Sequence, residues 1–330
     1  RGGTRPPKPL IMGFIATLAG QGHAVESICR VLTEQGCQVA ARTYRAARRA
    51  GPTAREEADA HLMNTIIGVC WKTEQDGRRR ATPESLYGRR KMTGHLRRRG
   101  EAVSEGHVGR CLKLLGHSGI RRAKKVRTTI PNPAGVRAED LLGRRFTATD
   151  PDAVWVTDFT YVRTWAGFVY VAFIIDVYSR RIVAWHAATR KGVDLVMTPL
   201  RMALWERARA GHPVTAGTLI HHSDAGSEYT SHRLTAHLDL EGIAASIGSV
   251  GDALDNALME TANGLYKTEC IRTLIFHDQP FRTLADVEYA TAGWVHWYNH
   301  DRLHSSIGMI PPVEFEQAYY AALNRELQPV

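Results

Sequence analysis

The chain has 330 residues, a net charge of +10, 44% hydrophobic residues and 23% charged residues. These values are ordinary for a globular protein with room for two or three domains and a full core. They exclude a membrane protein, because no apolar run reaches the roughly 20 residues that cross a bilayer. Five scattered cysteines, never spaced as CxxC, indicate reduced thiols in the cytoplasm and argue against a zinc finger.

Residues 1–75 predict a helical head. Residues 1–9 are rich in Gly, Pro and Arg, and we expect them to form a disordered lead without a signal peptide. Apolar residues at helical spacing predict an amphipathic helix over residues 24–35. Two more helices are predicted over residues 40–50 and 53–71. The head alone indicates no function.

The positive charge is concentrated between Arg78 and Arg127, where 16 Lys and Arg outnumber three acids. This segment carries more net positive charge than the chain as a whole, which is typical of a protein region that binds a polyanion. Helices over residues 83–99 and 105–116 predict a helix-turn-helix within an all-α DNA-binding region of residues 76–130. A plain helical hairpin has the same shape, and the charge is what favours DNA. The cations expected to contact DNA are Arg89, Arg90, Lys91, Arg97, Arg98, Arg99, Arg110, Lys113, Arg121, Arg122, Lys124 and Lys125.

A proline-spaced linker is predicted over residues 131–149, and the hydrophobic period changes after it. Three β-rich runs in hairpin sequence are predicted over residues 153–163, 167–177 and 180–188. Helices and short strands then alternate, which predicts an α/β core with a mixed sheet over residues 150–275. A helical C-terminal extension is predicted over residues 276–330.

Three carboxylates of the core stand in three different local settings. Asp158 lies inside an apolar run, Asp224 ends another, and Glu260 lies in a predicted helix. An ionised Asp in a buried strand is costly, and gathering three acids adds repulsion that a cation can relieve. Ligation by oxygen alone points to magnesium or manganese. Lys267 follows Glu260 by two helical turns, so it lies on the same face and could bind a neighbouring phosphate.

The chain resembles the insertion sequence three family, the orfB-type transposases with a retroviral-integrase-like catalytic core. The resemblance rests on LYGRRKMTGHLRR (86–98), WVTDFTYV (155–162), GFVYVAFIIDVYSRRIVAW (167–185), HHSDAGSEYTS (221–231), DNALMETANGLYKTE (255–269) and WYNHDRLHSSIGMIPPVEFE (297–316). It covers nearly the whole chain. It implies a ribonuclease-H-like fold, a metal-binding triad of Asp158, Asp224 and Glu260, and Lys267 as the associated base.

The triad predicts metal-dependent DNA cleavage and strand transfer, with two divalent ions around the scissile phosphate. No covalent protein–DNA intermediate is needed, so Ser223 and Tyr229 are expected to be structural. Asp176, Asp252 and Asp255 are expected in turns, caps or strand ends. One alternative is a ribonuclease-H-like nuclease without strand transfer, which predicts a shorter chain without the basic helices. Another is a catalytically inactive DNA-binding regulator, which predicts the loss of an acid.

The expected partner is double-stranded DNA, both the element's terminal inverted repeats and the target. Joining two ends requires at least a dimer on DNA, in which Glu260 of one subunit can act on the end bound by another. The candidate subunit contacts are Val25, Ile28, Val31, Leu32, Trp294 and Trp297. The first residue is Arg1 instead of Met, so we expect a product fused behind an upstream frame. The family resemblance implies a DNA-associated protein of the bacterial cytoplasm.

Overall fold

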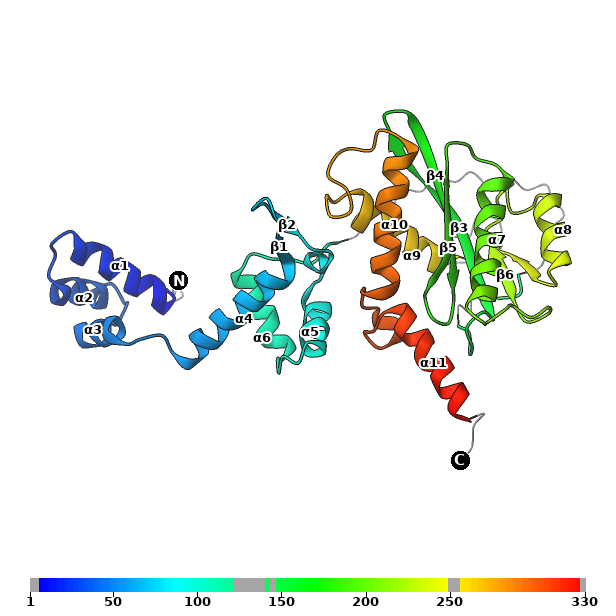
Figure 1. Cartoon of the computed structure of the whole chain (residues 1–330). Helices are drawn as coiled ribbons and strands as arrows, with labels where there is room; N and C mark the ends of the chain where they lie inside the picture. Colours follow the sequence, from blue (N-terminus) through cyan, green and yellow to red (C-terminus); the bar gives the residue numbers. More distant parts are fainter. Residues whose placement is uncertain (1–5, 122–139, 143–146, 249–255, 327–330) are drawn as a thin grey trace. The chain divides into compact units, whose positions relative to one another are not determined.

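The computed structural model describes residues 6–121, 140–142, 147–248 and 256–326 (Figure 1). The chain divides into two compact units, Arg1–Asn64 and Thr65–Val330, and the boundary falls inside helix α4 (Ala54–Cys70). Within the described residues, no helix is both long and apolar enough to cross a membrane.

The first unit is a three-helix head with its own small core. Its helices are α1 (Lys8–Gly20), α2 (Val25–Glu34) and α3 (Ala41–Arg49). Ile15, Ile28 and Tyr44, one from each helix, are buried together. The predicted disordered lead is therefore wrong from Lys8 onward, where α1 begins. Ile28 packs inside its own unit, whereas Val31 is exposed.

In the second unit, the end of α4 is followed by a two-stranded antiparallel ribbon that was not predicted, β1 (Trp71–Thr73) and β2 (Arg79–Ala81). The region before the core is therefore mainly helical, not all-α. A 3-10 helix η1 (Pro83–Leu86), helix α5 (Arg89–Arg98) and helix α6 (Glu105–Leu114) follow. The predicted single helix over residues 83–99 is interrupted at Gly88. There the backbone of Gly119 approaches so closely that a Cβ on Gly119 would lie 2.4 Å from the Gly88 nitrogen.

Five strands form the central sheet in the order β5-β4-β3-β6-β7. They are β3 (Val154–Thr164), β4 (Gly167–Asp176), β5 (Ile182–Ala188), β6 (Ile220–Ser223) and β7 (Ala244–Ile247). β4 is antiparallel to both β3 and β5, whereas β3, β6 and β7 run parallel. This mixed sheet confirms the predicted α/β core.

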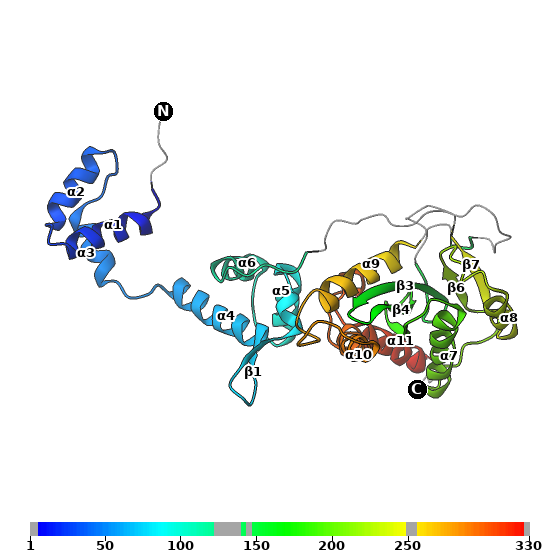
Figure 2. The ribbon, with the colours of Figure 1, turned by 90° about the horizontal axis from the view of Figure 1, so that it is seen from above.

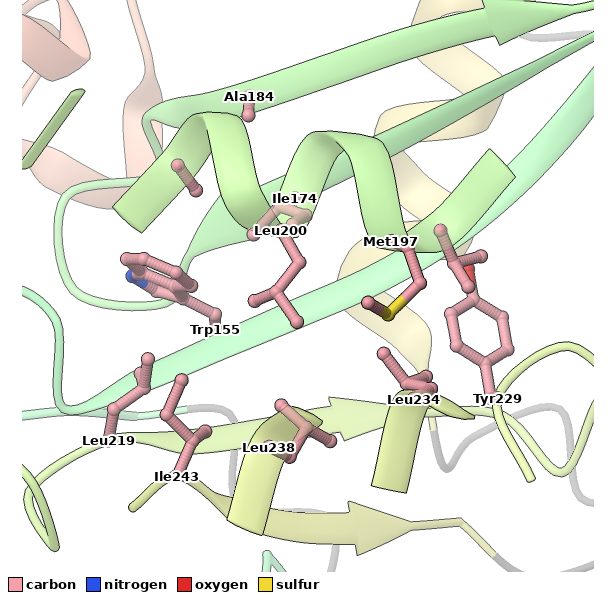
Figure 3. Packing of buried hydrophobic residues seen from close by; sticks show 12 residues of the cluster. Trp155, Ile174, Ala184, Met197, Leu200, Leu219, Tyr229, Leu234, Leu238 and Ile243 are labelled. Carbon is pink, nitrogen blue, oxygen red and sulfur yellow. The ribbon is translucent and has the colours of Figure 1, made fainter. Parts of the chain in front are cut away.

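Helices cover both faces of the sheet (Figure 1). On one face, α7 (Val193–Arg209) and α8 (His232–Leu240) pack over Trp155 and Ile174, with Leu200 and Leu238 between them (Figure 3). The other face carries α9 (Ala257–Leu265), its π-helical continuation η2 (Tyr266–Ile271) and α10 (Leu284–His300).

Aromatic rings hold the second face together. The ring of Phe173 in β4 lies 5.0 Å from that of Tyr266 and 5.9 Å from that of Trp294. Trp294 and Trp297 of α10 are both buried, so these two rings are packed within the subunit. The 3-10 turn η3 (Ser305–Ile307) leads to α11 (Pro312–Glu326).

Candidate active site

Strand register brings the first two carboxylates together. Asp158 lies in β3 on the sheet face that carries Phe173, its partner in β4. β3 pairs in parallel with β6, and Val156 lies opposite His222. Asp158 lies two residues beyond Val156, and Asp224 lies two residues beyond His222. Because parallel strands advance together by about 3.3 Å per residue, the two carboxylates come side by side at the end of β6.

Glu260 approaches the same point from the first turn of α9, which runs beside β3 (Figure 2). Burial raises the pKa of the Asp158 carboxyl, and the negative charges of Asp224 and Glu260 raise it further. Such charge effects require groups that lie close to one another. The fold therefore collects three acids that are separated by 65 and 35 residues in the chain.

Asp224 lies in a tight turn beside a fourth acid, Glu228, which the sequence analysis missed. The Gly226 N–H donates to Asp224 Oδ1 over 3.1 Å. Burial raises the pKa of Asp224, although the residue is partly exposed to solvent. The negative charge of Glu228 raises this pKa further. Glu228 is buried and pairs with Lys191 at 3.6 Å. Its position four residues after Asp224 was the only signal in the sequence.

Asn263 was also missed, although it lies one turn after Glu260 on the same helix. Its Nδ2 donates to Asp158 Oδ2 over 2.8 Å, while Asp158 Oδ1 accepts the N–H of Phe159 over 2.8 Å. Both bonds fix the orientation of the Asp158 carboxylate. The i, i+3 spacing from Glu260 was the signal that could have identified Asn263.

We expect Asn263→Ala to lower DNA cleavage and joining by about 10–100-fold, because an unoriented carboxylate binds metal less well. The Mg²⁺ concentration needed for half-maximal rate should rise, which a purely structural role would not cause. Leu240→Ala, at an exposed position of α8, is the control. An unchanged Mg²⁺ dependence in Asn263→Ala would contradict this role.

The donor chemistry of these residues fits a divalent cation. Three carboxylates offer only oxygen donors, the set that magnesium and manganese prefer. Two buried oxygens nearby, Asn263 Oδ1 and Glu228 Oε2, have no hydrogen-bond partner among the described residues. Buried acceptors of this kind are costly unless a ligand or its water completes them.

Lys267 is near the triad, but not on the regular α-helix that was predicted. It lies in η2, and π-helical turns occur frequently at functional sites. Its Nζ lies 4.6 Å from the centroid of the Tyr161 ring. Burial and the charge of Arg272 lower the pKa of Lys267, whereas the charge of Asp158 raises it.

The other acids and hydroxyls have structural contacts. The Tyr229 hydroxyl lies 3.4 Å from Thr157 Oγ1, and Ser223 Oγ donates to the carbonyl oxygen of Asp224. Asp176 Oδ1 accepts the backbone N–H and the hydroxyl of Ser179. Asp252 and Asp255 lie outside the described residues.

Several of the predicted DNA-binding cations have partners within the protein. Arg89 Nε donates to Glu105 over 2.8 Å, and Arg97 Nε donates to the carbonyl oxygen of Val103 over 2.9 Å. Arg98 makes two hydrogen bonds with Glu314, of 3.1 and 2.5 Å.

The remaining cations of this set differ in exposure. Lys91 and Arg110 are half-buried. The exposed residues are Arg90, Arg99, Lys113 and Arg121. Arg122, Lys124 and Lys125 lie outside the described residues.

Known families and proteins match much of the chain. Two integrase core domain families match residues 148–253 and 241–312. The transposase assigned to insertion sequence element IS986/IS6110 of Mycobacterium tuberculosis is 44% identical over 274 residues, covering 83% of this chain and 93% of the relative. The transposase for insertion sequence element IS629 of Shigella sonnei is 45% identical over 241 residues, covering 73% of this chain and 77% of the relative.

Among solved structures, the HTLV-2 integrase catalytic core domain in complex with magnesium is similar to part of the chain. It is 15% identical, with a TM-score of 0.38, and the match covers 51% of this chain and 98% of that one.

Proposed function

Because the chain belongs to the insertion sequence three family of DDE transposases, with an integrase core domain, we propose that Asp158, Asp224 and Glu260 are its catalytic triad. The enzyme is a polynucleotidyl transferase that cuts and joins DNA at the ends of an insertion element. The observation that carries the assignment is the β3–β6 register, which aligns Asp158 with Asp224 next to the Glu260 helix.

In the proposed mechanism the protein holds and orients the reacting groups. Asp158, Asp224 and Glu260 would hold Mg²⁺ or Mn²⁺, with two ions per site. Bound ions would supply Lewis-acid activation of the attacking water or DNA 3′-hydroxyl and stabilisation of the leaving oxygen. Asn263 keeps the Asp158 carboxylate in one orientation through its 2.8 Å hydrogen bond. Lys267 supplies a positive charge for a DNA phosphate beside the triad.

The two alternative functions explain less of the chain. A nuclease without strand transfer has no need of the basic helices α5 and α6 in the same unit. An inactive regulator has no need of two further acids placed beside the Asp158 carboxylate. The transposase proposal accounts for both features.

An assay with purified full-length protein tests the proposal. Labelled DNA carrying the end of the element that encodes this chain is incubated with Mg²⁺ and a target duplex. We expect joined products in addition to nicks, because one site can both hydrolyse an end and join its 3′-hydroxyl. Nicks alone would favour the nuclease, and a mobility shift without chemistry would favour the regulator.

The remaining assignments are proposals of the same kind. The cations of residues 76–130 bind the terminal inverted repeats, and residues 150–275 carry the chemistry. Residues 131–149 link the two; of these, residues 131–139 and 143–146 lie outside the described residues. Residues 1–75 form a head and residues 276–330 an extension. On DNA we expect at least a dimer in the bacterial cytoplasm. The mass of the complex with two DNA ends, measured by light scattering, tests the dimer.

A further inference from the structure

Helices α5 and α6 are anchored to the C-terminal part of their own unit. The Tyr87 side chain is buried, and its hydroxyl accepts the N–H of Leu303 over 3.1 Å. Trp297 Nε1 donates to Glu84 Oε1 over 3.0 Å, and its ring packs against Tyr87. With the Arg98–Glu314 pair, these contacts join the basic helices to α10 and α11.

The anchoring leaves an open groove of about 1610 Å³ between the basic helices and α9. One wall comes from the start of α5, from α6 and from residues 117–121. The other wall comes from α9, from Thr268 and Glu269 in the middle of η2, and from residues 302 and 304–306. The groove therefore lies between the predicted DNA-binding element and the helix that carries Glu260.

The groove is lined by positive charge. Arg89, Arg90, Lys91, Arg110, Lys113 and Arg121 line the first wall. Arg180 and Arg302 face them from the other side, and Glu269 is the only acid among the described lining residues. Glu269 is already paired with Arg302 at 2.7 Å. Glu105, outside the lining, pairs with Arg89 at 2.8 Å and lies 3.9 Å from Arg90. The cations still outnumber the acids, a condition that a bound polyanion would relieve.

The pKa of Lys91 agrees with this concentration of positive charge in the groove. Burial, followed by the charge of Arg302, lowers the pKa of Lys91 to about 7, although the charge of Glu269 acts in the opposite direction. A phosphate in the groove would favour the charged form again.

Helix α9 presents different faces to the groove and to the triad. Leu258, Thr261 and Leu265 line the groove, whereas Asn263 reaches Asp158 from another face. The residues that line the groove follow the i, i+3, i+4 spacing of one helical face. A ligand in the groove would therefore contact α9 without touching the catalytic carboxylates.

We propose that this groove binds the phosphate backbone of the element's DNA end, so that α6 and α9 of one subunit hold the same DNA segment. The proposal rests on the function proposed above and adds a second DNA-contacting wall outside the helix-turn-helix. The cations come from several separate segments, a spread that fits an extended polyanion better than a single phosphate group.

The test introduces charged residues on the α9 wall of the groove, so that the cations of the groove and the basic helices α5 and α6 remain unchanged. Binding of labelled terminal-repeat duplex to the full chain is measured without divalent metal, so that chemistry does not contribute. We expect Thr261→Glu and Leu258→Glu each to weaken DNA binding about tenfold. Thr261→Lys should tighten DNA binding, and the slope of log affinity against log salt concentration should become steeper by about one unit. A tighter complex cannot result from misfolding, so Thr261→Lys keeps the test valid if a Glu variant is unstable.

Leu240→Glu, on the exposed surface of α8, is the matched control and should bind as the wild type does. Wild-type DNA affinity in both Thr261 variants would overturn the proposal that the groove binds DNA. An equal change for an RNA duplex, with none for DNA, would overturn DNA as the occupant. If the Thr261 variants change DNA affinity but the wild-type protein never joins DNA, the transposase proposal is overturned, whereas the proposal that the groove binds DNA is kept.

Discussion

Asp158→Asn, Asp224→Asn and Glu260→Gln are each expected to lower DNA cleavage and joining by about 10³-fold or more. Each change keeps the shape of the side chain and removes one negative charge from the set that would hold the metal. Binding of terminal-repeat DNA should remain close to wild type, because the basic helices are unchanged. Single-turnover joining in Mg²⁺ and a mobility-shift assay measure the two properties separately.

The stability of Asp158→Asn provides a control against misfolding. The folded-state pKa of Asp158 is raised, so the native state binds a proton more tightly than the unfolded state does. Stability from this group therefore falls as pH rises from the ordinary carboxyl pKa toward the raised value. The amide removes that cost, and without metal the variant should melt at or above the wild-type temperature at pH 7. Near-normal joining by any one of the three variants would remove that residue from the triad.

The same variants test how subunits share the work. Glu260→Gln, which should bind DNA, is mixed with a protein that keeps its triad but has Lys113→Glu and Arg121→Glu. Recovered joining would mean that the triad of one subunit acts on an end bound by the other. If the mixture stays inactive and the DNA complex has the mass of a monomer, action between subunits is ruled out.

Arg207→Met is expected to cost about 3–5 kcal/mol of unfolding free energy, because removing one partner leaves the other charge buried and uncompensated. Arg207 of α7 is 2% exposed, and its Nη1 and Nη2 donate to Glu316 of α11. Its Nε also lies 2.8 Å from Asp152. Urea denaturation of the full chain at pH 7 measures the loss.

Two observations make this prediction specific. Arg209→Met, two residues along the same helix in an exposed pair with Glu206, should change stability by less than about 1 kcal/mol. Burial raises the pKa of Glu316, but the bonds and charge of Arg207 outweigh it and hold that pKa below its usual range. The contribution of the pair is thus present above the unfolded pKa and is lost as pH falls through the folded one. A loss in Arg207→Met that equals the loss in Arg209→Met would contradict the buried pair.

Local patterns in the chain were enough to predict many elements of the fold. The three β-rich runs became β3, β4 and β5, and Ser104 caps α6 as predicted, with its side chain accepting the N–H of His107. These features depend on hydrophobic period and on hydrogen bonds between residues three or four apart. The helix α1 was missed because a proline-rich lead precedes it, although Pro9 is tolerated in the first helical turn.

The candidate site was only partly predictable. The sequence identified Asp158, Asp224 and Glu260 through their settings and a family resemblance, but not Asn263 or Glu228. An asparagine in a helix and an acid after a turn are common, so nothing local distinguishes them. Their contacts with Asp158 and Asp224 depend on how α9 and the β6 turn pack against β3.

By itself, the sequence determined the family, the three acids, the α/β character of the core and the concentration of positive charge before it. Tertiary structure alone decided that the β3–β6 register aligns Asp158 with Asp224, that η2 carries Lys267 to Tyr161, and that Arg98 pairs with Glu314. It also decided which cations line a groove shared with α9. The physical reason is that composition, period and capping act between near neighbours, whereas register, burial and charge pairing depend on residues that are distant in the chain and meet only when it folds.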